Sequence, residues 1–152
     1  MRSKHPLSLG FLEGLIGFRL RLAQISLFED FERALRPFDI TPTRFGALVL
    51  IEANSGLSQM QLAKTIRLDR STLVALLDHL EGKGLVKRRP SPTDKRTNEL
   101  VLTDEGRKLL AKAKRRVQEH EKRLFGKLSA SDRAELKRLL EAVSAKKYNN
   151  TL

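Results

Sequence analysis

The chain contains no cysteine among its 152 residues. This absence excludes disulfide bonds, thiolate metal sites and thiol redox sensing, and it fits a protein of the reducing cytoplasm. Tryptophan is also missing, there is one tyrosine, and aromatic residues make up only 5% of the chain. Proteins that bind single strands without sequence preference stack bases on aromatic side chains, and this chain offers few of them.

The sequence also lacks the motifs of common catalytic sites. It has no Gly-rich phosphate loop, no Gly-x-Ser-x-Gly elbow and no His-Glu-x-x-His pair. His5 and His79 are too isolated in the sequence for a metal site, and His120 is expected to be a hydrogen-bonded interface residue. We therefore expect a protein that is not an enzyme, with no catalytic residue, metal or cofactor.

No apolar run is long enough to span a membrane, because charged residues such as Glu13 and Arg19 interrupt the N-terminal run. No small-residue cleavage site follows it, so a secretion signal is not expected either.

Positive charge dominates the chain, with a net charge of +12 and a pI near 10.5. The excess rises along the sequence, from +1 over residues 1–40 to +4 over 41–103 and +7 over 104–152. Such a field attracts polyanions. Nucleic acid is the commonest one, but an anionic membrane, a ribosome or a merely solvated basic surface also fits the charge.

Apolar residues recur in three- and four-residue steps on two faces between Ser8 and Pro37, which predicts a first helix over this span. A helix that is apolar on two faces must be covered on both sides. One subunit of this size covers one face, so a second copy is the natural cover for the other. The pattern therefore predicts a homodimer.

Local capping chemistry predicts where the later helices begin. Thr41 with Pro42, Ser58 with Gln61, Asp69, Thr103 and Ser129 each stand before an apolar-periodic segment. Between the fourth and fifth helices, residues 85–89 and 99–103 alternate like short strands around a break at 90–93. The predicted fold is mainly α with a small β-hairpin wing.

The helix that begins after Asp69 has the layout of a DNA recognition helix. Its core face carries Leu73, Leu76, Leu77 and Leu80, and its N-terminal turn is set to meet base edges and phosphates. Arg70 suits a bidentate contact with guanine. The candidate DNA-binding residues on this helix are Arg70, Ser71, Thr72, Ala75 and His79.

The hairpin supplies a second group of basic residues. Arg96 at its tip suits an A·T-rich minor groove, where Asp94 could hold the guanidinium in place; an exposed ion pair of little consequence is the alternative. The other predicted contacts are Lys95 at the tip and the phosphate-binding residues Lys87, Arg88 and Arg89.

At these residues the sequence resembles the multiple-antibiotic-resistance regulator (MarR) family. The resemblance runs through residues 57–63 (LSQMQLA), 69–73 (DRSTL), 80–88 (LEGKGLVKR), Asp94-x-Arg96 and residues 100–106 (LVLTDEG). The sequence departs from the family pattern at Val74 and Ala75, where polar residues are frequent, and at residues 66–68, which lack a frequent glycine.

The resemblance implies a winged helix-turn-helix region over residues 41–103. Residues 1–40 and 104–152 then form a helical dimerisation region, the whole being one intertwined domain. It further implies a cytoplasmic regulator of transcription, in most cases a repressor, that binds a pseudo-palindromic operator in double-stranded DNA as a homodimer. The missing cysteine excludes the family's thiol-based peroxide sensors.

The resemblance also implies a small effector, an aromatic or lipophilic acid, that binds between the reading head and the dimerisation helices and weakens DNA binding. An arginine among aromatic side chains suits an aromatic carboxylate. The candidate lining residues are Phe18, Arg19, Leu22, Arg44, Phe45 and Leu48. The alternative function is a non-specific, basic architectural nucleic-acid-binding protein without an effector.

Overall fold

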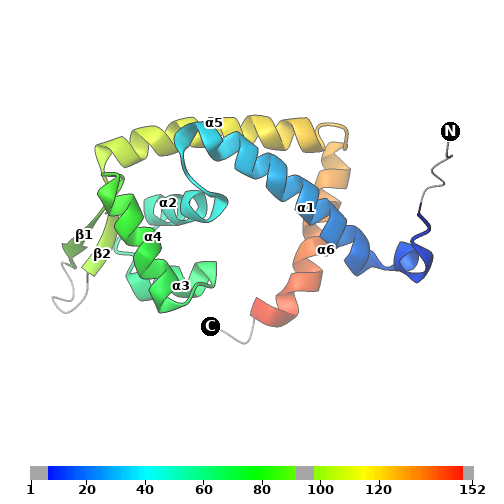
Figure 1. Ribbon diagram of the computed structural model, residues 1–152, viewed down its shortest axis with the longest axis horizontal. Helices are drawn as coiled ribbons and strands as arrows, with labels where there is room; N and C mark the ends of the chain where they lie inside the picture. The colour runs from blue at the N-terminus through cyan, green and yellow to red at the C-terminus, as the bar shows by residue number, and fades with distance from the viewer. Residues whose placement is uncertain (1–6, 92–97, 149–152) are drawn as a thin grey trace.

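The computed structural model describes residues 7–91 and 98–148 and is mainly helical with one hairpin (Figure 1). Two 3-10 helices, η1 and η2, lie before α1 and between α1 and α2. The elements run η1 (Gly10–Gly14), α1 (Ile16–Leu35), η2 (Arg36–Phe38), α2 (Pro42–Ala53), α3 (Gln59–Ile66), α4 (Arg70–Gly82), β1 (Val86–Pro90), β2 (Asn98–Leu102), α5 (Asp104–Phe125) and α6 (Ala130–Tyr148).

The predicted helix caps are confirmed at all five helices. The side chains of Thr41, Ser58, Asp69, Thr103 and Ser129 each accept a hydrogen bond from a backbone amide in the following first turn, at 2.9–3.3 Å. Ser58 forms the full capping box, because its own amide donates to the Gln61 side chain at 2.9 Å. These bonds satisfy amides that the helix itself leaves without partners.

The hairpin is also confirmed, within one residue at each end. Strands β1 and β2 are antiparallel, with Val86 opposite Leu102 and Pro90 opposite Asn98. The backbone amide of Leu100 donates to the carbonyl of Leu57 at 2.9 Å, which ties the hairpin to the segment before α3. The winged helix arrangement is therefore held by backbone bonds as well as by packing.

One hydrophobic core lies between α2, α3, α4, the hairpin and the near ends of α1 and α5. The four leucines predicted for the inner face of α4 are all buried. The side chains buried most completely come from every one of these elements: Leu35, Leu48, Leu62, Leu77, Leu80, Leu100 and Leu110. A core shared in this way fixes α4 relative to the hairpin.

The prediction of one helix from Ser8 to Pro37 is wrong at its start. A 3-10 turn covers Gly10–Gly14, Leu15 is extended, and the α-helix begins only at Ile16. Gly10 adopts a positive φ of 52°, a conformation that glycine reaches without steric cost but that a continuous helix excludes. Apolar periodicity therefore continued past the point where the backbone could remain helical.

Apolar side chains are exposed along α1 and α6, away from the core. Figure 1 shows α1 crossing α5 obliquely, while α6 turns away from the end of α5. The exposed apolar residues of α1 and α6 include Leu20, Leu22, Ile25, Phe28, Leu136, Leu139, Leu140 and Val143. No helix among the described residues is long and apolar enough to cross a membrane.

Candidate functional site

The N-terminus of α4 is organised around one carboxylate. Asp69 accepts hydrogen bonds from the Ser71 hydroxyl, from the Thr72 amide at 2.9 Å and from the Thr72 hydroxyl at 2.6 Å. These donors, the Ser71 hydroxyl first, hold the pKa of Asp69 far below its usual range. Both hydroxyls therefore donate their protons within the cap, and only their oxygen lone pairs remain for an outside partner.

The outer face of α4 is open to solvent. Arg70, Ser71, Thr72 and Ala75, four of the predicted DNA contacts, have exposed side chains on this face. His79, one of the predicted contacts, is half-buried at the far end of the helix. Burial, followed by the nearby Arg44 charge, lowers its pKa.

The C-terminus of α4 is linked to the turn that follows α1. The ammonium group of Lys83 forms an ion pair with the Asp39 carboxylate and donates to the Asp39 carbonyl at 3.1 Å. The Lys83 hydrogen bond lowers the pKa of Asp39. Helix α4 is thus joined at this point to the segment that connects α1 to α2.

Two of the three predicted phosphate contacts on β1 are held by carboxylates. The Arg88 guanidinium pairs with Glu81 and with Asp78, the latter at 2.9 Å, and its backbone amide donates to Glu81 at 2.9 Å. Arg89 pairs with Glu99, which is only 3% exposed. These pairs fasten the hairpin to α4 and to itself.

The third of these residues, Lys87, has an exposed side chain. The predicted wing-tip contacts, Asp94, Lys95 and Arg96, lie outside the described residues.

The turn between α3 and α4 contains a residue in the left-handed backbone conformation that is not glycine. Arg67 ends α3 at a φ of 56°, and it lies within residues 66–68, the turn that lacks the glycine frequent in the family the sequence resembles. Its backbone amide donates to the Ala63 carbonyl in the usual manner of a helix end. The departure noted in the sequence therefore leaves the turn geometry intact.

The six predicted effector residues do not surround one cavity in the structure. Leu48 is completely buried in the core, and Phe45 packs edge-on against Phe31 with ring centroids 5.8 Å apart. Arg44 lines a small polar pocket beside η2. The remaining three lie on α1, where Phe18 is half-buried and both Arg19 and Leu22 are exposed.

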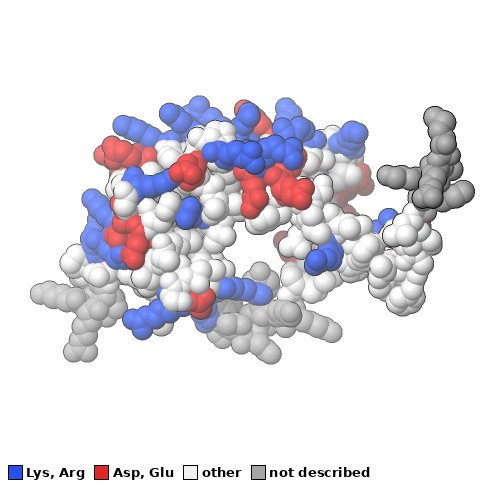
Figure 2. Space-filling model, in the orientation of Figure 1, with Lys and Arg blue, Asp and Glu red and all other residues white. Residues whose placement is uncertain are grey.

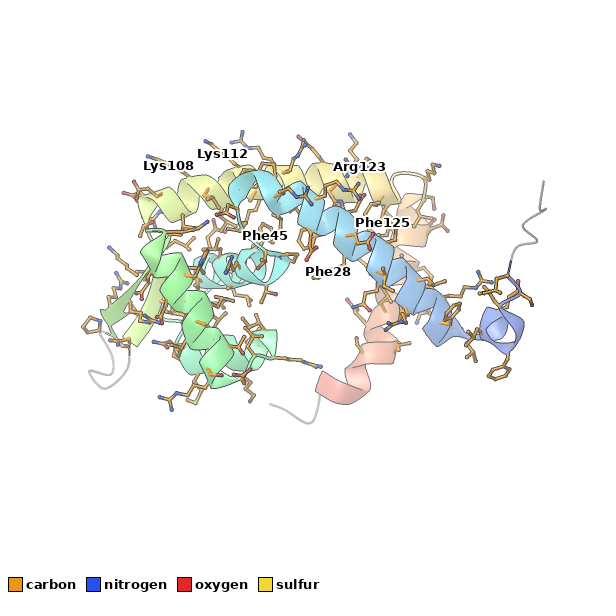
Figure 3. The ribbon with its side chains drawn as sticks, viewed as in Figure 1. Phe28, Phe45, Lys108, Lys112, Arg123 and Phe125 are labelled. Atoms are coloured by element: carbon orange, nitrogen blue, oxygen red, sulfur yellow. The ribbon has the colours of Figure 1, made fainter. Side chains whose placement is uncertain are left out.

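An apolar cavity of about 340 Å³ lies further along α1, where this helix packs on α5. Figure 3 labels Phe28 on α1 and Phe125 near the end of α5, two of the aromatic side chains that line it. The lining residues are Leu20, Ala23, Gln24, Leu27, Phe28, Phe31, Val117, His120, Glu121, Leu124 and Phe125. Six of them belong to apolar helix stripes of the sequence, which periodicity alone did not distinguish from core: Leu20, Ala23, Leu27, Phe28, Val117 and Leu124.

His120 is the buried polar residue in the wall of this cavity. It is 4% exposed and stacks on Phe31, with ring centroids 5.7 Å apart. Its Nδ1 is buried without a hydrogen-bond partner among the described residues of this chain, and the expectation that His120 is hydrogen-bonded at the dimer interface stays a prediction. Buried polar atoms without a partner are rare in folded proteins, which sets His120 apart from its apolar neighbours.

The surface charge is uneven. Lys and Arg side chains gather along the outer edge of α5 and around the hairpin (Figure 2). Lys108 and Lys112 project from the side of α5 that faces away from α2 (Figure 3). Within residues 7–91 and 98–148, no group of three or more His, Asp or Glu side chains is placed to hold a metal ion.

Comparison with known proteins gives a consistent match. Residues 38–97 match the MarR family model. Over 133 residues, the chain is 38% identical to a putative transcriptional regulatory protein for the hcr operon of Thauera aromatica; the match covers 87% of this chain and 80% of that protein.

Two solved structures of the transcriptional repressor CouR match over almost their whole length. CouR bound to a 23-mer DNA duplex is 41% identical with a TM-score of 0.86, covering 92% of this chain and 99% of CouR. CouR bound to p-coumaroyl-CoA is 39% identical with a TM-score of 0.81, covering 94% of this chain and 99% of CouR.

Proposed function

Because the chain belongs to the MarR family of winged-helix transcriptional regulators, we propose that it is a homodimeric repressor that binds a specific duplex operator. We further propose that an aromatic acid, or the coenzyme A thioester of one, releases it from DNA. The observation that carries the proposal is the open face of α4, which a shared core and the Arg88 ion pairs hold beside the hairpin.

In this proposal α4 lies in the major groove and reads base edges from its N-terminal half. Arg70 is the principal base-reading side chain, while the hydroxyl oxygens of Ser71 and Thr72, whose protons are donated to Asp69, accept from amino groups on the base edges. The small side chain of Ala75 allows α4 to approach the bases closely. The match to a repressor that was solved on a DNA duplex supports binding to double-stranded DNA.

In this proposal the hairpin positions the winged helix-turn-helix region on the phosphate backbone of the DNA. Lys87 binds phosphate, and the wing-tip residues Lys95 and Arg96, with Asp94 as the positioning carboxylate, approach the minor groove. Arg88 and Arg89 lie on the same strand as Lys87. Their ion pairs with Glu81 and Glu99 orient β1 and partly neutralise the two guanidinium groups, so both bind phosphate more weakly than Lys87 does.

The homodimer is supported by the exposed apolar faces of α1 and α6. Contiguous apolar surface of this kind is unusual on a monomer and marks an interface. A two-fold dimer through these helices places two copies of α4 about one DNA turn apart. Leu139→Glu is expected to give monomers in sedimentation experiments and to abolish high-affinity operator binding.

The effector site in this proposal is the cavity between α1 and α5. Its lining is almost wholly apolar, and His120 supplies a buried imidazole for one hydrogen bond to a ligand. CouR was solved with p-coumaroyl-CoA, an aromatic acyl thioester. The cavity has the size and polarity for an aromatic acyl group, which the free acid and its thioester share.

Selection of bound sequences from a random duplex pool at physiological salt tests the DNA-binding part. The expected result is an enriched inverted repeat with half-sites about 10 base pairs apart. If no sequence is enriched and binding collapses steeply with added salt, the chain is instead the non-specific architectural protein that its charge also allows.

Titration of the protein–operator complex tests the effector part. p-Coumaroyl-CoA, p-coumarate and coenzyme A alone are added separately while operator release is followed by fluorescence anisotropy. Ala23→Phe fills the cavity and is expected to remove the response without changing operator affinity, whereas Ala111→Phe on the exposed face of α5 is expected to keep it. Release by coenzyme A alone, or an undiminished response in Ala23→Phe, contradicts the proposed site.

A further inference from the structure

The polar groups on the outer face of α4 are already largely committed within the protein. The hydroxyls of Ser71 and Thr72 donate to Asp69. Asp78, near the other end of the same face, pairs with Arg88 at 2.9 Å. In the middle of the helix the exposed side chains are instead apolar, at Val74 and Ala75.

Val74 shares a groove with a second exposed apolar side chain. Val74 is 37% exposed, and Met60 in the first turn of α3 is 79% exposed. Both line a groove of about 510 Å³ between α3 and α4, to which Arg70 and Asn98 also contribute. A single exposed apolar residue needs no explanation, but two that line one groove beside the base-reading arginine form an apolar contact surface.

The major groove of DNA presents one apolar group on its base edges, the C5-methyl of thymine. Guanine, adenine and cytosine offer hydrogen-bond donors or acceptors there, and these lose solvation without compensation against an apolar surface. We propose that Val74 and Met60 bind the C5-methyl of one thymine in each half-site, beside the base that Arg70 reads. This inference rests on the proposed DNA-binding function.

A contact with a thymine methyl group accounts for the departure from the family pattern at Val74. A polar side chain there forms hydrogen bonds to bases, whereas valine discriminates by excluding polar edges. Specificity at this position is therefore expected to come from a methyl group and not from the hydrogen bonds of the base pair. The two modes of recognition separate cleanly when thymine is replaced by deoxyuridine, which pairs identically and lacks only the methyl group.

The experiment uses the full-length protein and the operator obtained by selection. Each thymine is replaced in turn by deoxyuridine, at the symmetric position in both half-sites, and Kd is measured by anisotropy. At one position we expect a loss of about fourfold per half-site. This factor corresponds to about 0.8 kcal/mol for one buried methyl group, at 1.4 kcal/mol per tenfold change in Kd.

The same substitutions are then measured with variant proteins. Val74→Ala and Met60→Ala are expected to bind the thymine and deoxyuridine operators with affinities that differ by less than twofold. Lys87→Ala is the matched control, because loss of a phosphate contact weakens both operators equally and keeps the difference of about fourfold per half-site. Urea unfolding of each variant checks that the fold is intact.

The outcomes separate the two proposals. If selection enriches no sequence, the proposed function fails and the deoxyuridine experiment has no operator on which to be performed. If an operator is found but no thymine is sensitive to loss of its methyl group, the assignment of Val74 and Met60 is overturned while the proposed function stands. Sensitivity that persists unchanged in both alanine variants overturns it equally.

Discussion

Gly106, in the first turn of α5, is expected to tolerate no side chain. A Cβ at this position would overlap the carbonyl oxygen of Leu85 and lie 2.9 Å from its carbonyl carbon. Leu85 cannot easily move away, because its amide donates to the Leu80 carbonyl at 2.9 Å and its carbonyl accepts from the Thr103 amide at 3.1 Å. Gly106→Ala must therefore shift α5 relative to the base of the hairpin.

The direction of the effect opposes helix propensity. Alanine inside a helix is favoured over glycine by about 0.5–1 kcal/mol, so propensity alone predicts stabilisation. Overpacking a tight contact costs about 1–3 kcal/mol, and here the obstructing atoms belong to the backbone. We expect Gly106→Ala to lower the free energy of unfolding by about 1–2 kcal/mol after the gain in propensity is included.

Urea unfolding followed by circular dichroism measures this change, at one fixed protein concentration because the stability of a dimer depends on it. A loss of about 2 kcal/mol lowers the midpoint by about 1 M urea. Gly46→Ala is the matched control, because Gly46 is also helical and nothing lies within 4 Å of its Cβ position. If both variants raise the midpoint alike, the reasoning about the α5–Leu85 contact is refuted.

Four further predictions concern the reading head and the cavity. Arg70→Ala should relax the preference at one base of each half-site, by about 1–3 kcal/mol per contact; unchanged preferences in a repeated selection would exclude it as a reading residue. Arg96→Ala should weaken binding by about 1–3 kcal/mol, most strongly beside A·T-rich sequence, and equal losses everywhere would make it a phosphate contact. The folded-state pKa of Asp69 is depressed, chiefly by the Ser71 hydroxyl, so the stabilisation of the fold by this carboxylate is complete above the unfolded pKa near 3.8 and is lost as pH falls through the folded pKa. The urea midpoint of the protein should therefore decrease below about pH 4. In Ser71→Ala the midpoint should decrease less steeply with falling pH. His120→Phe should raise the free energy of unfolding by about 1 kcal/mol by removing an unpaired buried nitrogen and should raise the effector concentration needed for release; a lower stability would indicate that Nδ1 has a partner in the dimer.

Local chemistry made much of the fold predictable. The caps at Thr41, Ser58, Asp69 and Thr103 act over three residues, so their consequences can be read directly from the sequence. The hairpin was predictable for a similar reason, since strand alternation and a proline-rich break both lie within one short segment. The start of α1 was not, because apolar periodicity continues through Gly10 although its backbone conformation interrupts the helix.

The candidate site was predictable only in part. The exposure of Arg70 and Ala75 follows from helix periodicity, because buried leucines fix the opposite face. The pairing of Arg88 with Asp78 and Glu81 joins residues from two elements, and no local pattern distinguishes it from a free phosphate contact. The cavity beside His120 depends on how α1 crosses α5, a packing angle that periodicity leaves undetermined.

The length of α5 has a mechanical consequence. Its 22 residues form a rod of about 33 Å at 1.5 Å per residue, with Gly106 abutting the hairpin at one end and the cavity near the other. Over this length, a tilt of the helix by about 5° about its cavity end moves its hairpin end sideways by about 3 Å. That displacement is close to the roughly 3.4 Å spacing of successive bases. We therefore expect that, in the proposed dimer, a ligand that tilts α5 at the cavity shifts each hairpin relative to the DNA by about one base step.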